Sequence, residues 1–123
     1  MAKNAFVTWG GWDGHEPEQT ATIFAEVLRT EGYQVEVSNS LDAFEDEAFT
    51  NSQDLIVPVW TMAGISREQE TGLLQAIRAG TGCAGWHGGM ADSFRQNVEY
   101  QFMVGGQFIC HPGGVIDYEV NIT

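Results

Sequence analysis

The chain has 123 residues, of which 43% are hydrophobic, a length that suits one compact domain over residues 1–123. Seventeen Asp and Glu residues against five Lys and Arg residues leave a formal net charge of −12, which argues against binding to nucleic acid or to an anionic membrane surface. The apolar stretch at residues 5–9 is too short for a signal peptide or a membrane span. We therefore expect a cytoplasmic protein.

The two cysteines, Cys83 and Cys110, lie far apart in the sequence and lack CxxC spacing. This usage favours reduced thiols over a disulfide, a zinc ribbon or a thioredoxin motif.

Apolar periodicity in the first half of the chain predicts strands and helices in alternation. Strands are expected at residues 5–9, 33–37 and 54–60, the last with the near-continuous apolar run of a buried parallel strand. Pro58 within that run suits only the end of a strand, because proline has no amide hydrogen to donate. A helix is expected at residues 17–31, opened by Pro17 and closed by Gly32. Residues 41–49 form an acidic segment of weak helical character.

The second half continues the alternation. Ser66 and Gln69 have the spacing of a capping box, for a helix that ends at Gly80. A fourth strand at residues 81–86, a third helix from Met90 to about Val104 and a final strand at residues 115–123 follow. This order predicts an α/β three-layer sandwich, flavodoxin-like or Rossmann-like, with a mainly parallel sheet. Ligands of such folds bind at the carboxyl ends of the strands, here in the loops after the first, third and fourth.

The segment Gly85-Trp86-His87-Gly88-Gly89 carries the strongest functional signal. Its glycines have the spacing of a nucleophile elbow, the sharp turn that exposes one side chain above a sheet edge. A histidine at that position suits a general base, a proton shuttle or a metal ligand better than a covalent nucleophile. We therefore predict that His87 is catalytic, and the alternative is a hydrogen-bonded structural histidine.

The other two histidines, His15 and His111, also lie in glycine-bracketed loops. If they converge with His87 at the sheet edge, the three rings form a possible site for a divalent metal, zinc or manganese, with Asp13 or Glu119 as an oxygen donor. The alternatives are local, since Asp13 can fix a turn, His15 can cap a helix and His111 is held extended before proline. No HExxH or similar ligand pair supports the metal site.

Aromatic rings beside carboxylates suit the binding of sugars through stacking and hydrogen bonds. The expected sugar-binding residues come from the same loops and from the last strand: Trp12, Asp13, His15, Trp60, Trp86 and Glu119. Core packing is the alternative for at least two of the four tryptophans. The Gly10-Gly11 pair lacks the GxGxxG pattern and is followed by acidic residues, so no nucleotide cofactor is expected.

From the first strand to the chain end, the sequence resembles ThuA-like proteins of the trehalose-utilisation family. The most specific match is Gly85-Trp86-His87-Gly88-Gly89-Met90-Ala91-Asp92-Ser93-Phe94-Arg95, supported by Gly14-His15-Glu16 and by the run from Glu99 to His111-Pro112. The resemblance implies a class I glutamine amidotransferase-like, flavodoxin-type fold in which His87 replaces the amidotransferase cysteine, so glutaminase activity is not expected. It also implies a sugar substrate, in a route where partner sugar dehydrogenases oxidise disaccharides to keto derivatives.

Three functional hypotheses follow. The first is an enzyme of sugar catabolism, an isomerase or hydrolase, that binds a sugar or keto-sugar at the sheet edge with His87 as base or metal ligand. The second is a non-catalytic sugar-binding accessory or regulatory protein on the same scaffold. Amidotransfer through Cys83 or Cys110 ranks last.

Family members are usually longer than this chain, so a further strand and helix are expected to be missing after residue 123. The sheet edge that this would leave unpaired predicts homo-oligomers or poor solubility.

Overall fold

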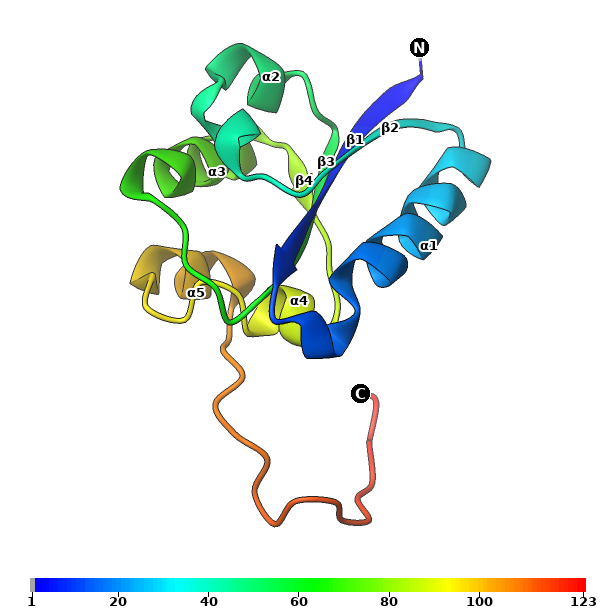
Figure 1. Cartoon of the computed structure of the whole chain (residues 1–123), viewed down its shortest axis with the longest axis vertical. Helices are drawn as coiled ribbons and strands as arrows, with labels where there is room; N and C mark the ends of the chain where they lie inside the picture. The colour runs from blue at the N-terminus through cyan, green and yellow to red at the C-terminus, as the bar shows by residue number, and fades with distance from the viewer. Residues whose placement is uncertain (1) are drawn as a thin grey trace.

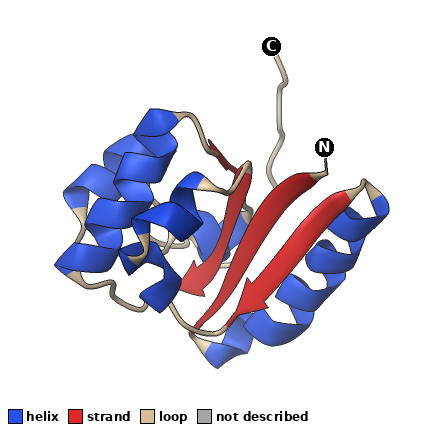
Figure 2. Ribbon diagram, turned by 90° about the horizontal axis from the view of Figure 1, so that it is seen from above, coloured by secondary structure: helices blue, strands red, loops and turns tan. Residues whose placement is uncertain are grey.

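The computed structural model describes residues 2–123, and its centre is a four-stranded, fully parallel sheet with strand order β2-β1-β3-β4 (Figures 1 and 2). The strands are β1 (Lys3–Gly11), β2 (Tyr33–Ser38), β3 (Leu55–Thr61) and β4 (Gly82–Cys83). The helices are α1 (Pro17–Thr30), α2 (Glu47–Asn51), α3 (Arg67–Ala79), α4 (His87–Ala91) and α5 (Val98–Val104), with short 3₁₀ turns η1 (Asp13–His15) and η2 (Asp42–Glu45).

Helices cover both faces of the sheet, which makes a three-layer α/β sandwich and confirms the flavodoxin-like prediction (Figure 2). On one face, Val7 and Val57 pack against Ala21 and Ala25 of α1. On the other, Phe6 and Ile56 of the same two strands pack against Leu73 of α3 and against Phe44. Successive strand residues point to opposite faces, so β1 and β3, buried on both sides, need the continuous apolar runs seen in the sequence.

The strands β1 and β3 end side by side. Their register pairs Gly10 with Trp60 and Gly11 with Thr61. Because both strands run in the same direction, the loops that follow them leave the sheet at the same edge. This edge is where ligands of open parallel sheets bind.

Pro58 lies inside β3 and not at its end, which corrects the sequence expectation. Proline is tolerated there because β4 pairs with β3 only through Leu55 and Ile56. Pro58 has the same strand parity as Ile56, so its nitrogen faces the β4 side beyond the last ladder pair, where no hydrogen-bond donor is required. Helix α4 fills this space, with Gly89 so close to β3 that an added Cβ would lie 3.1 Å from the Val59 Cα.

Three predicted elements differ in the structure. The fourth strand is Gly82–Cys83 rather than residues 81–86, since the ladder with β3 ends there. The helix expected from Met90 to Val104 is two short helices: the first ends at Ala91, and the left-handed backbone conformation of Phe94 (φ 49°) in the connection keeps it from continuing into the second, which begins at Val98.

Residues 115–123 alternate between apolar and polar side chains but form no strand. No other described strand pairs with them, and an alternating segment becomes a strand only when its backbone finds a ladder partner. The segment extends away from the body of the fold (Figure 1). Within residues 2–123, no helix is both long enough and apolar enough to cross a bilayer.

Gly72 of α3 lies against the backbone of the η2 turn, so Gly72→Ala should destabilise the fold. A Cβ at this position would lie 1.7 Å from the Phe44 carbonyl oxygen, which forces the backbone apart. We expect a loss of about 1–3 kcal/mol in the free energy of unfolding, measured by urea denaturation. The matched control is Gly64→Ala, where an added Cβ meets nothing within 4 Å and the change should stay within about 0.5 kcal/mol. Equal effects of the two variants would contradict this packing.

Candidate functional site

Backbone hydrogen bonds tie together the segments at the carboxyl edge of the sheet. The Trp12 amide, just after β1, donates to the Thr61 carbonyl oxygen at 3.0 Å. The Met62 amide, just after β3, donates to the carbonyl oxygen of Asp92 at the end of α4, at 2.8 Å. These two bonds link the loop after β1 to the end of β3, and the loop after β3 to the end of the helix that follows β4.

His87 is the first residue of α4 and has a left-handed backbone conformation, with φ at 49°. A non-glycine residue rarely adopts this conformation, and such strain is concentrated at functional sites. Met62, at the end of β3, has the same feature with φ at 66°. The exposed side chain of His87 thus stands on a sharp turn above the sheet edge, as the glycine spacing predicts.

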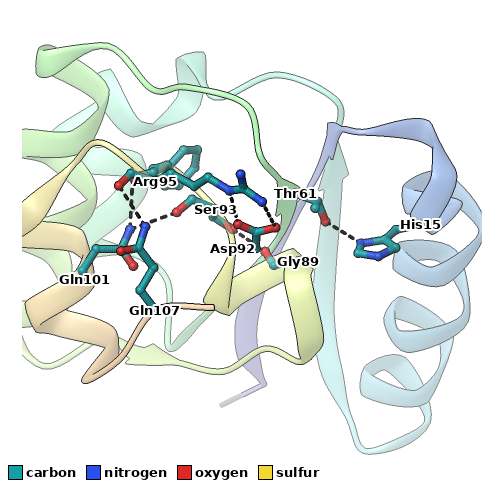
Figure 3. Close-up of polar contacts among 9 residues, drawn as sticks. His15, Thr61, Gly89, Asp92, Ser93, Arg95, Gln101 and Gln107 are labelled. Carbon is teal, nitrogen blue, oxygen red and sulfur yellow. Dashed lines mark hydrogen bonds and ion pairs between the residues drawn. The ribbon is translucent and has the colours of Figure 1, made fainter. Parts of the chain in front are cut away.

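His15 lies beside His87, brought there by the η1 turn after β1. Their ring centroids are 4.8 Å apart in an edge-to-face arrangement, and the centroid of the Trp12 ring lies 4.7 Å from that of His15. The His15 Nδ1 is hydrogen-bonded to the Thr61 Oγ1 at 2.9 Å (Figure 3). Gly88 permits this approach, because an added Cβ would lie 2.7 Å from the His15 Cε1.

The His15 pKa is lowered from its ordinary value of 6.5, first by desolvation and then by repulsion from His87, with a smaller contribution from His111. The Asp92 carboxylate opposes these effects and raises the pKa. Because the lowering wins, His15 is neutral at pH 7. A neutral imidazole offers one ring nitrogen as a donor and the other as an acceptor.

The third histidine comes from the segment after α5. The Phe108 amide donates to the Ala91 carbonyl oxygen at 2.8 Å, and the Gln107 Nε2 donates to the Arg95 carbonyl oxygen at 3.0 Å. These bonds hold the segment against α4. The ring of His111 lies 4.8 Å from the ring of Phe108 and faces the same cavity as the other two histidines.

This cavity has a volume of about 220 Å³. Its lining residues are Trp12, His15, Met62, His87, Gly88, Ala91, Asp92, Phe108 and His111. A larger, open hollow of about 430 Å³ lies between α2 and α3, but it is bordered largely by polar side chains and contains no histidine. Of these two, the histidine cavity is the better candidate site because it joins titratable rings, aromatic side chains and strained backbone at the ligand-binding edge of the sheet.

Four of the expected sugar-binding residues lie outside the cavity lining. Trp60 packs against the hydrophobic core, where its ring covers Gly10 of β1. Trp86 stacks on Phe24 of α1, with ring centroids 3.9 Å apart. Asp13 is exposed at the start of η1, and Glu119 is exposed in the extended C-terminal segment. Trp12 and the three histidines are the expected site residues that the structure brings together.

Sequence reasoning missed Asp92, which is 2% exposed and lines the cavity. Both of its carboxylate oxygens accept hydrogen bonds from Arg95, one of them from Nη2 at 2.9 Å (Figure 3). Its position in the sequence was the one available signal: Asp92 comes five residues after His87, at the end of the helix that begins at the elbow, and so could have been expected near the site. Met62 and Phe108 were also missed, because nothing in a linear pattern shows which loop residues face a common cavity.

The expected metal site is not ready-made. Among residues 2–123, no group of three or more His, Cys, Asp or Glu side chains is arranged to hold a metal ion. The three imidazoles and the Asp92 carboxylate have donor atoms suited to a metal ion. However, both Asp92 oxygens accept hydrogen bonds from Arg95, and the His15 Nδ1 is bonded to Thr61. Metal binding would require the rings to turn toward a common point.

A family model for trehalose utilisation, ThuA, matches residues 4–123. The chain belongs to the ThuA family. The match includes every residue that lines the cavity of this ThuA-family chain. No curated protein and no solved structure matches it significantly.

The pH titration of His15 tests the cavity electrostatics. We expect the NMR signal of the His15 ring to titrate below pH 6.5, because the fold disfavours the charged ring. Since the pKa is depressed on folding, the contribution of His15 to stability is complete above pH 6.5 and is lost as the pH falls through the lowered pKa. His87→Ala should move the midpoint up by removing the repelling ring, and His111→Ala should move it up less. A midpoint unchanged in His87→Ala would contradict the described arrangement.

Proposed function

We propose that this ThuA-family chain binds and transforms a sugar or keto-sugar in the histidine cavity, with His87 as the general base. The observation that carries the proposal is the convergence of His87, on its strained turn, with His15 and His111 around one aromatic-walled cavity. The family's description, trehalose utilisation, supports a carbohydrate substrate.

An imidazole is suited to removing a proton from a carbon next to a carbonyl group, which is the weakly acidic position of a keto-sugar. In the proposed reaction His87 takes this proton while negative charge develops on the carbonyl oxygen. His15 can stabilise that oxygen: when the Thr61 hydroxyl donates to Nδ1, the proton of the neutral ring lies on Nε2 and is free to be donated. Isomerisation follows if His87 returns the proton to the former carbonyl carbon while the hydroxyl on the deprotonated carbon passes its own proton to the former carbonyl oxygen. Cleavage follows instead if the enolate re-forms the carbonyl and expels a glycosidic oxygen from the next carbon: that oxygen takes the proton from His87 and leaves as an alcohol, and the sugar is left as an unsaturated ketone.

A divalent ion, zinc or manganese, belongs to the proposal only as an option. If bound, it would be held by His15, His87 and His111 and would polarise a sugar oxygen as a Lewis acid. None of the steps above depends on it. Elemental analysis of the purified protein tests this option directly.

The second candidate function is a non-catalytic sugar-binding accessory or regulatory protein. The observation that favours it is the histidine at a turn where hydrolases carry a Ser or Cys nucleophile. Amidotransfer is disfavoured because Cys83 lies in β4, where burial raises the pKa of its thiol to about 11 and keeps it protonated. Release of ammonia from glutamine would revive that third candidate.

Turnover of mono-keto derivatives of trehalose, followed by NMR, tests the proposal. We expect His87→Asn to lower the rate by about 10²–10⁴-fold, because it removes the base. Asparagine tolerates the left-handed conformation of residue 87, so the fold should remain intact by circular dichroism. Gly64→Ala, in an open loop, is the control and should retain full turnover.

Unchanged turnover in His87→Asn would remove the proposed role of His87. Sugar binding without any product in the wild-type protein would favour the accessory function instead.

A further inference from the structure

The histidine cavity is small. Its volume of about 220 Å³ lies below the roughly 300–1,000 Å³ of typical sites for drug-sized ligands, and corresponds to about seven water molecules. A complete disaccharide is about the size of a drug-sized ligand and would need a site in that larger range of volumes. The dimensions therefore favour a single ring as the buried part of the ligand.

The lining is rich in flat rings. The Trp12 ring contacts that of His15, the Phe108 ring contacts that of His111, and Ala91 adds an apolar surface. A pyranose ring fits such a lining because it shows C–H groups on its faces and hydroxyl groups around its edge. The ring nitrogens of the histidines are placed to meet only a few of those hydroxyl groups.

The charges of the lining favour a neutral ring. The guanidinium of Arg95 is bonded to both carboxylate oxygens of Asp92. It is therefore not free to pair with a phosphate or a carboxylate on the ligand, and the Asp92 charge repels such a group. Each Asp92 oxygen keeps a second lone pair that can accept a hydrogen bond from a sugar hydroxyl.

The rim leaves room for the rest of a glycoside outside the cavity. Trp12 is 50% exposed, Met62 is 45% exposed and His111 is exposed, so a second sugar attached to a buried ring would lie over these residues in contact with solvent.

We propose that the cavity takes one neutral pyranose ring, in parent or keto form, and leaves the second sugar or other aglycone of a glycoside outside. This inference rests on the proposed sugar-binding function. It makes the terminal ring the recognised unit, so glycosides with different second groups share one binding mode.

Saturation-transfer NMR and titration calorimetry test this with methyl glucoside, methyl maltoside and glucose 6-phosphate, the first two also as their keto derivatives. The two rings of methyl maltoside give separate signals. We expect methyl glucoside and methyl maltoside to bind within about 3-fold of each other, with saturation concentrated on one ring. Glucose 6-phosphate should bind at least about 10-fold more weakly.

Equal saturation of both maltoside rings, a disaccharide at least about 10-fold tighter than the single ring, or tight phosphate binding would overturn the one-ring inference while leaving sugar binding intact. No binding by any of the sugars would overturn the proposed function and the inference together.

Two variants localise the binding. Ala91→Leu should abolish it by filling the cavity, and Trp12→Ala, at the half-exposed rim, should weaken it about 10-fold without loss of the fold. Ala48→Leu is the matched control, because Ala48 is an exposed alanine on α2 that borders a different hollow. Ring binding unaffected by Ala91→Leu and Trp12→Ala would place the ligand elsewhere and overturn the inference.

Discussion

The candidate site depends on the shared end of β1 and β3. The two strands end in register at Gly11 and Thr61. Thr61 then makes two hydrogen bonds to the loop that follows β1: its carbonyl oxygen accepts one from the Trp12 amide, and its hydroxyl is bonded to His15. Strand pairing is set by the buried apolar runs, so core packing fixes the position of the first imidazole. The chemistry at the edge is thus positioned by the two central, buried strands of the sheet.

The elbow adds the second imidazole by a close approach that only glycine permits. Gly88 lets the His15 ring lie against the first turn of α4, and Gly89 lets the same turn lie against Val59 of β3. These two contacts bring His87 next to His15 while the left-handed turn keeps its side chain exposed. The result is a pair of adjacent imidazoles in which His87 helps to lower the pKa of His15, so that His15 is favoured in the neutral form beside the exposed ring of His87.

Sequence patterns were informative where local chemistry decides the structure. The Ser66 capping box, the Pro17 helix start and the glycine elbow each follow from short-range geometry, and each is present as expected. The patterns failed where a partner distant in sequence decides, as for residues 115–123, which alternate but have no paired strand. For Trp60 and Trp86 they left core packing open beside sugar binding, and both rings pack on other elements. Asp92 belongs to the same class, because its burial depends on α4 packing under the loop after β3.

Pro58 has a consequence for how this sheet edge can change. A longer β4 would need a donor from residue 58 of β3 to continue its ladder, and proline has none to offer. The ladder between β3 and β4 therefore cannot extend past Pro58, and the space beside that part of β3 is left for α4. Pro58, an unfavourable residue within a central strand, thus limits the length of β4 and prevents further strand pairing from closing the edge where the histidine cavity lies.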